Sequence, residues 1–243
     1  PSPTNGTLYS GGIVLTNTTT LRAVGFRAGF QPTAPETHTY IFLDHVIRQT
    51  GAGFPTNWGG VDAEYAMSQA IVNDPQWAPT IRADLLAVPT LSVTMRVEDL
   101  FGPAGIYSNP DGYGVAWERP CSLEYIRPDG EKGFHVNCGI RFQGGVSRTA
   151  MRKNGLRLLF KSIYGPGKLK YDLYPDSPVK EFDTLVLKGS FNDHWGWVGA
   201  PAQLQRDQWC RDAQNDMGGY GPHGTYVHLY LNGLYWGLYN LGE

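Results

Sequence analysis

From residue 89 to the end of the chain, apolar and polar residues alternate in short runs, which predicts a series of β-strands. A hairpin turning at residues 128–130 returns along a strand whose apolar face holds Phe134, Val136, Cys138, Ile140 and Phe142. In the next run, residues 156, 158 and 160 share an apolar face, while Lys153 and Arg157 have the opposite parity unless Gly155 bends the strand. Lys153 and Arg157 are therefore expected to point together.

The last hairpin is the clearest local pattern. Asn232 and Gly233 predict a two-residue type I′ turn, which fixes the register of both strands. The core face then pairs Leu231 with Leu234, Leu229 with Trp236, and Val227 with Leu238. The other face carries Tyr226, His228, Tyr230, Tyr235, Gly237 and Tyr239. Such an aromatic face either stacks on a base or packs against a helix, and packing is the more common use.

The rest of the chain divides into three parts. Residues 1–42 contain three or four short strand patterns, too few for a complete sandwich. Residues 43–88 show short helical spacings and predict a linker that packs against the rest. Residues 201–219 predict one helix that buries Leu204, Ala213 and Met217, pairs Asp207 with Arg211, and ends at Gly218.

Composition narrows the class of protein. With 243 residues, 41% of them hydrophobic and 17% charged, the chain can bury one sizeable core. A net charge of −2 offers no general attraction to nucleic acid, so no nucleic-acid partner is expected. No stretch is apolar for long enough to predict a membrane span. The chain begins at Pro1 rather than Met and stops directly after the last hairpin, which we interpret as a piece of a larger protein.

The cysteines and histidines predict no metal site, because paired C-x-x-C and helical His spacings are missing. Cys121 and Cys138 lie in neighbouring predicted strands. They form either a disulfide or, as we favour, two buried free thiols.

Residues 139–160 hold the most informative candidate site. A strand runs into Gly144 and Gly145, the loop carries Ser147 and Arg148, and basic residues open the next strand. Glycine backbone N–H groups and a strand-borne lysine can hold phosphates. The spacing matches neither G-x-x-x-x-G-K-[ST] nor G-x-G-x-x-G, so a plain hairpin with a solvated basic rim is the competing interpretation.

Seven blocks of sequence follow one another from residue 71 onward. They are VNDP at 72–75, VPTLSV at 88–93, GIYSNP at 105–110, WERPCSLEYIRPDG from 117, the glycine loop with RKNGLRLLFKSIYG, EFDTLVLKGSFNDHWGW from 181, and HGTYVHLYLNGLYWGLYNLGE from 223. In this order they resemble the bacterial spore-coat protein H (CotH) kinase-like family. Met151 and the pair Asn154–Gly155 depart from the residues common there, which loosens any statement about the geometry of the loop.

The resemblance implies a minimal kinase N-lobe that uses ATP and Mg²⁺. Lys153 would pair with the nucleotide phosphates, and the helix that carries Arg206 would brace the sheet. Residues 239–243 would lead toward a C-lobe, where the acidic metal ligands and the base are expected, so residues 1–243 are expected to transfer no phosphate alone. The cofactor-binding residues implied in this way are Ser147, Arg148, Lys153, Arg157, Tyr239 and Glu243.

Residues 7–42 resemble the second half of the β-sandwich module at the C-terminus of bacterial chitobiases and related hexosaminidases. We therefore expect an α+β fold, mainly an antiparallel sheet with a few helices like a kinase N-lobe. Residues 1–42 would form a partial β-sandwich, 43–88 a helical linker, and 89–243 the N-terminal part of the CotH kinase-like domain. The expected function is the nucleotide-binding part of an atypical secreted or cell-surface kinase that phosphorylates secreted or surface proteins. The alternative is a non-catalytic extracellular binding or architectural module.

Overall fold

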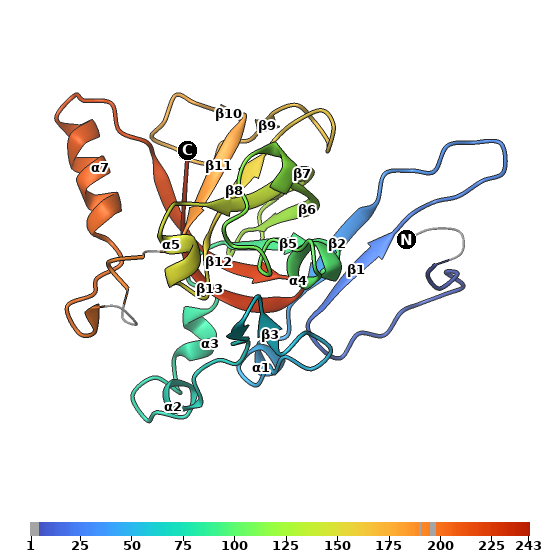
Figure 1. Cartoon of the computed structure of the whole chain (residues 1–243), viewed down its shortest axis with the longest axis horizontal. Coiled ribbons are helices and arrows are strands. Elements are labelled where there is room, and N and C mark those ends of the chain that lie inside the picture. The colour runs from blue at the N-terminus through green and yellow to red at the C-terminus, as the bar shows by residue number, and fades with distance from the viewer. Residues whose placement is uncertain (1–4, 190, 195–197) are drawn as a thin grey trace.

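A computed structural model describes residues 5–189, 191–194 and 198–243 (Figure 1). Residues 195–197, the end of one block of the CotH resemblance, lie outside the described residues. In the part described, no helix has both the length and the apolar character needed to cross a membrane.

The centre of the fold is a closed barrel of seven strands in the order β11-β13-β12-β5-β6-β7-β8, in which β8 pairs with β11 to close it. All neighbours are antiparallel except β5 and β12, which run parallel. The barrel strands are β5 Thr90–Thr94, β6 Arg119–Ile126, β7 Phe134–Gln143, β8 Gly155–Leu159, β11 Thr184–Lys188, β12 Gly224–Leu231 and β13 Leu234–Gly242. The predicted mainly antiparallel sheet is confirmed, and its closure into a barrel goes beyond the prediction.

Apolar side chains from every second position fill the barrel. The apolar faces predicted for 134–142 and 156–160 are confirmed: Val136, Cys138, Ile140 and Phe142 are buried on one strand, and Leu156, Leu158 and Phe160 follow on the next. Because successive side chains of a strand point to opposite faces, the remaining positions form the outer surface of the barrel.

The last hairpin corrects one prediction. The type I′ turn is confirmed, since Asn232 and Gly233 have φ values of 50° and 82°. A β-bulge follows, because the register shifts between Leu229 and Tyr230 and Leu229 lies opposite Gly237 rather than Trp236. One extra residue reverses the parity of everything beyond it.

Tyr239 is therefore on the core face opposite Val227, with 2% of its surface exposed, and Leu238 is 40% exposed on the outside. The predictions of a Val227–Leu238 pair and of Tyr239 on the aromatic outer face are both wrong. Trp236, as predicted, is buried, at 1%.

The linker predicted at 43–88 is made of three four-residue helices and a two-stranded ribbon. These elements are α1 Leu43–Val46, β3 Asn57–Trp58, β4 Val61–Asp62, α2 Gln69–Val72 and α3 Ile81–Asp84. Val46, Ile47, Val72, Ile81 and Leu85 form a second apolar cluster that packs on Tyr230 of β12. The segment therefore packs against the barrel.

The helix predicted at 201–219 is shorter, α7 Arg206–Asp216, and stands beside the barrel (Figure 1). The ion pair between Asp207 and Arg211 is confirmed, and Gly218 ends the turn with φ 79°. The predicted apolar face of this helix is wrong, because Met217 is 81% exposed and the buried residue of α7 is Gln208. Helix α7 thus meets the sheet through polar contacts.

The N-terminal segment contributes one hairpin, β1 Thr19–Ala23 with β2 Glu36–Tyr40, which projects on the side opposite α7 (Figure 1). Hydrogen bonds hold β2 to the barrel: Thr37 Oγ1 donates to Ser122 Oγ at 3.0 Å, and the Thr39 N–H to Glu124 Oε2 at 2.7 Å. The sandwich assignment stays a prediction. The remaining elements are α4 Val97–Phe101, the 3₁₀ turn η1 Val115–Trp117, α5 Ser147–Ala150, β9 Leu169–Lys170 and β10 Glu181–Phe182.

Cys121 and Cys138 are register partners on β6 and β7, and they are buried free thiols with their sulfur atoms 3.5 Å apart. The hydrogen bond with Cys121, together with burial, raises the pKa of the Cys138 thiol well above its usual range. Cys210, in contrast, is exposed on α7.

We expect iodoacetamide to modify Cys210 in the native chain and to reach Cys121 and Cys138 only after unfolding, because the reagent needs an accessible thiolate. Intact mass and peptide mapping, with and without urea, measure this. Fast native alkylation of Cys121 would contradict the predicted burial, and two cysteines that resist alkylation in urea until a reductant is added would be a disulfide.

Candidate functional site

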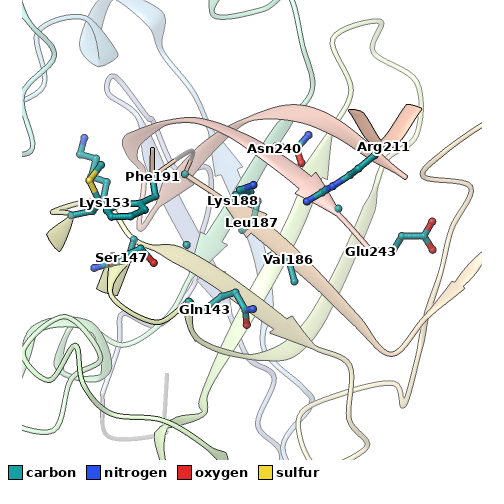
Figure 2. Close-up of a pocket in the computed structure, with 16 residues that line it drawn as sticks. Gln143, Ser147, Lys153, Val186, Leu187, Lys188, Phe191, Arg211, Asn240 and Glu243 are labelled. Carbon is teal, nitrogen blue, oxygen red and sulfur yellow. The ribbon is translucent and has the colours of Figure 1, made fainter. Parts of the chain in front are cut away.

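A cavity of about 350 Å³ lies on the outer face of the barrel, between the loop after β7 and helix α7 (Figure 2). Its walls come from Gln143 and Gly144 at the end of β7, Ser147 of α5, Met151, residues 153–155, residues 186–189 with Phe191, Arg211 of α7, and Asn240, Gly242 and Glu243 at the end of β13. Three lining side chains are basic, Lys153, Lys188 and Arg211, and one is acidic, Glu243. The charge of the lining favours an anion.

The floor of the cavity is nearly free of side chains. Val186 lies between Arg157 on β8 and Gly242 on β13 in the register of the sheet, so these three residues share the outer face. Gly155 lies two residues before Arg157 on β8 and therefore faces the same way. A Cβ on Gly242 would lie 3.2 Å from Arg211 Nη1, and one on Gly155 would lie 3.2 Å from two backbone oxygens. Glycine at these two positions therefore lets Arg211 and the neighbouring backbone pack closely against the strands.

Above this floor, Asp207 holds two cations in place. Lys188 Nζ lies 2.5 Å and Arg211 Nη2 lies 2.6 Å from the same oxygen, Asp207 Oδ2. Two cations and one carboxylate leave the cluster with one net positive charge. Figure 2 shows Lys188 near the middle of the cavity and Arg211 reaching over from α7.

Sequence analysis gave Lys188 and Asp207 no role in binding. Two signals were present in the chain: Lys188 ends an alternating strand on the same parity as Val186, and Asp207 pairs with Arg211 on a helix. What the sequence lacked was the contact between strand and helix, which joins residues 19 positions apart.

Lys153 lies at the other end of the cavity, beside Phe191 (Figure 2). Its ammonium group sits 5.1 Å from the centre of the Trp236 ring, a cation–π contact. Burial lowers the pKa of Lys153, and the charge of Glu64 opposes this shift. Lys153 is thus half-buried, unlike the solvated basic rim of the competing interpretation.

The glycine loop is held by its own backbone contacts. Gly144 has φ 119°, and a Cβ there would meet Ser147 Oγ at 2.3 Å, so the position requires glycine. With its amide nitrogen turned toward α5, Asn154 donates to the carbonyl oxygens of Ser147 at 2.9 Å and Arg148 at 3.2 Å. Asn154, which sequence analysis did not select, therefore fixes the position of Ser147 at the cavity.

The other predicted residues are placed as follows. Arg148 turns away from the cavity and donates from Nη1 to the Gly112 carbonyl oxygen at 2.9 Å. Arg157 lies beside Arg141 on the outer face of the barrel. Neither lines the cavity, and the predicted joint orientation of Lys153 and Arg157 fails because Lys153 precedes β8 and packs on Trp236. Their role in binding stays a prediction.

Tyr239 and Glu243 are close to the cavity in different ways. Tyr239 lies in the core below the cavity, and its hydroxyl donates to the backbone carbonyl oxygen of Asn154 at 3.1 Å. Glu243 lines the cavity, but its carboxylate points away from the other labelled side chains (Figure 2). It faces His223, whose Nδ1 is 2.5 Å from Oε1. Arg206, the family's basic position in the resemblance, lies outside the cavity beside Asp193, at 3.6 Å.

A larger cavity of about 1130 Å³ lies beside the end of α7, between residues 173–179 and 219–225. Its lining includes Asp176, Asp212, Asp216 and Glu243 and no lysine or arginine, so its charge suits a phosphate poorly. Among the residues that the structure describes, no group of three or more His, Cys, Asp or Glu side chains is arranged to hold a metal ion.

Comparison with known families supports the resemblance in the C-terminal part. Residues 140–243 match the family model described as CotH kinase protein, which indicates a kinase-like domain in this part of the chain. No curated protein matches the chain. All residues that line the 350 Å³ cavity fall within the matched range.

Proposed function

We propose that the 350 Å³ cavity binds ATP, as the nucleotide-holding part of an atypical protein kinase of the CotH type. The observation that carries the proposal is the Lys188–Asp207–Arg211 cluster, which stands over a glycine floor beside a glycine loop. Backbone N–H groups of such a loop together with fixed cations are the usual way in which proteins hold nucleotide phosphates.

The order of elements supports the same proposal. In protein kinases a glycine-rich loop between two strands is followed by a strand lysine, which pairs with an acidic residue of the next helix. Here β7, the glycine loop and β8 are followed by β11 with Lys188, and then by α7 with Asp207. The run Leu185–Lys188, L-V-L-K, is three apolar residues followed by lysine, as is the V-A-I-K run of that kinase strand, and Val186 and Lys188 lie on one face.

The residues divide into three roles under this proposal. Lys188 and Arg211 attract the phosphates, and Asp207 holds both cations in place; Lys153 adds positive charge at the loop end. Gly155 and Val186 accept the flat base. When bound, Mg²⁺ would neutralise phosphate charge, and since no metal-holding group occurs in the described part of the chain, we assign it no ligand here. We further propose a secreted or surface protein as the acceptor.

Calorimetric titration of the 243-residue chain with ATP, adenosine and tripolyphosphate tests the proposal. We expect one saturable site, with ATP binding at least about tenfold more tightly than adenosine, because the cationic cluster adds to the binding of the base. Absence of saturable ATP binding up to about 5 mM, a free energy near −3 kcal/mol, would contradict the proposal and favour the architectural module.

A further inference from the structure

A chain of three polar side chains joins α7 to the floor of the cavity. Gln208 Nε2 donates to Asp212 Oδ1 at 2.7 Å, and Asn240 Nδ2 donates to Gln208 Oε1 at 3.0 Å. Gly224 leaves room for this chain, since a Cβ there would lie 2.2 Å from Gln208 Oε1. These contacts are the polar surface through which α7 meets the sheet.

The carboxylate at one end fixes the direction of both amides. A carboxylate accepts hydrogen bonds, so Gln208 must present its NH₂ group to Asp212 and its oxygen to Asn240. Asn240 must then donate to the Gln208 oxygen, which leaves the carbonyl oxygen of Asn240 at the end of the chain of side chains farthest from Asp212. Hydrogen-bond chemistry therefore fixes the orientation of the Asn240 amide.

That oxygen, Asn240 Oδ1, is a buried acceptor without a hydrogen-bond partner among the described residues. Asn240 is 4% exposed and lines the 350 Å³ cavity, and Figure 2 shows its oxygen on the side of Lys188 and Arg211. Buried acceptors almost always have a donor, so an orphan in a cavity points to a donor on a ligand.

The neighbouring groups limit what this donor can be. Phosphate oxygens accept and do not donate at neutral pH, so they do not satisfy Asn240 Oδ1. A Cβ on Gly242 would lie 3.2 Å from Arg211 Nη1, 3.5 Å from the His223 carbonyl oxygen and 3.9 Å from Asn240 Oδ1, so Arg211 already covers Gly242. A flat group therefore rests over Val186 rather than over Gly242, and the acceptor Asn240 Oδ1 on the neighbouring strand β13 is the group it meets.

We propose that Asn240 selects adenine, its Oδ1 accepting a hydrogen bond from the exocyclic amino group of the base. Adenine carries that amino donor beside a ring-nitrogen acceptor, whereas guanine carries an oxygen acceptor in the same place, which Asn240 Oδ1 repels. The inference rests on the proposed nucleotide function and adds the residue that decides the base.

Titration of the full chain with ATP, GTP, purine riboside triphosphate and 2′-deoxy-ATP tests this proposal. Purine riboside triphosphate differs from ATP only by the missing amino group. We expect ATP to bind at least tenfold more tightly than either purine riboside triphosphate or GTP. We expect 2′-deoxy-ATP to bind about as tightly as ATP. Equal binding of ATP and purine riboside triphosphate overturns the proposal while leaving nucleotide binding intact. Loss of binding only with 2′-deoxy-ATP overturns it in favour of a ribose hydroxyl.

Two variants separate recognition from folding. Asn240→Leu removes the acceptor and should reduce the ratio of ATP to purine riboside triphosphate affinity to about one. Asp212→Asn leaves the cavity untouched but allows both amides to reverse, so it should lower the preference for ATP over GTP at least threefold. Asp216→Asn, on the same helix and outside the chain of amides, is the matched control and should keep the preference. An unchanged ratio in folded Asp212→Asn and Asn240→Leu contradicts the proposal, and absence of binding to every nucleotide contradicts the proposed function instead.

Discussion

Replacing Lys188 by Met is expected to weaken ATP binding at least tenfold, about 1.4 kcal/mol, while the chain keeps its fold. Methionine keeps the apolar stem and removes the charge that faces the cavity. The side chain of Lys188 is 38% exposed and its ion pair with Asp207 lies at the surface, so the stability lost is at most about 1 kcal/mol. Calorimetric titration with ATP and urea unfolding measure the two effects.

Lys168→Met is the matched control for this experiment. Lys168 also forms a surface ion pair, with Asp183 at 2.9 Å, and it does not line the cavity. The Lys168→Met variant should therefore bind ATP as tightly as the unchanged chain does. If Lys188→Met and Lys168→Met bind ATP equally well, Lys188 has no part in holding the phosphates.

The substitution Trp236→Ala is expected to lower the free energy of unfolding by about 3–5 kcal/mol. Trp236 is 1% exposed and lies at the centre of an aromatic cluster, with ring centres of Trp58 at 5.1 Å and Tyr107 at 5.4 Å. Its Nε1–H also donates to Tyr107 Oη at 2.8 Å, so alanine leaves a cavity and an unpaired polar group. Urea unfolding followed by circular dichroism gives the change in stability.

Trp209→Ala tests whether this loss belongs to the buried position or to tryptophan in general. Trp209 lies on α7 with 70% of its surface exposed, and its replacement should change the unfolding free energy by less than about 0.5 kcal/mol. Similar losses for the two variants would show that the bulge at Trp236 and the core below it are described wrongly.

Local periodicity was sufficient to predict what short-range rules control. The apolar faces of 134–142 and 156–160 and the turn at Asn232–Gly233 follow from parity and from positive φ, which depend on neighbours in sequence. The same parity rule failed beyond Trp236, because a bulge inserts one residue and the alternation of apolar and polar residues does not mark it. Gly237, with φ 140°, was the available signal.

The parts that depend on distant contacts could not be predicted. Closure of the barrel joins β5 to β12 and β8 to β11, and no local pattern specifies either pairing. Helix α7 was assigned an apolar buried face, whereas Gln208 is its buried residue, because a partner amide on β13 satisfies it. For the same reason the binding cluster was missed: Lys188 gains its neighbours only once α7 packs beside β11.

We propose that ATP occupies the cavity over β8, β11 and β13, and backbone chemical-shift mapping on addition of ATP tests this most directly. We predict that the largest shifts occur in residues 143–155, 186–189 and 240–243, which surround the cavity. Residues 173–179 and 219–225, around the larger acidic cavity, should change little. Shifts centred on that second cavity, or no saturable shifts, would contradict ATP binding in the cavity over β8, β11 and β13.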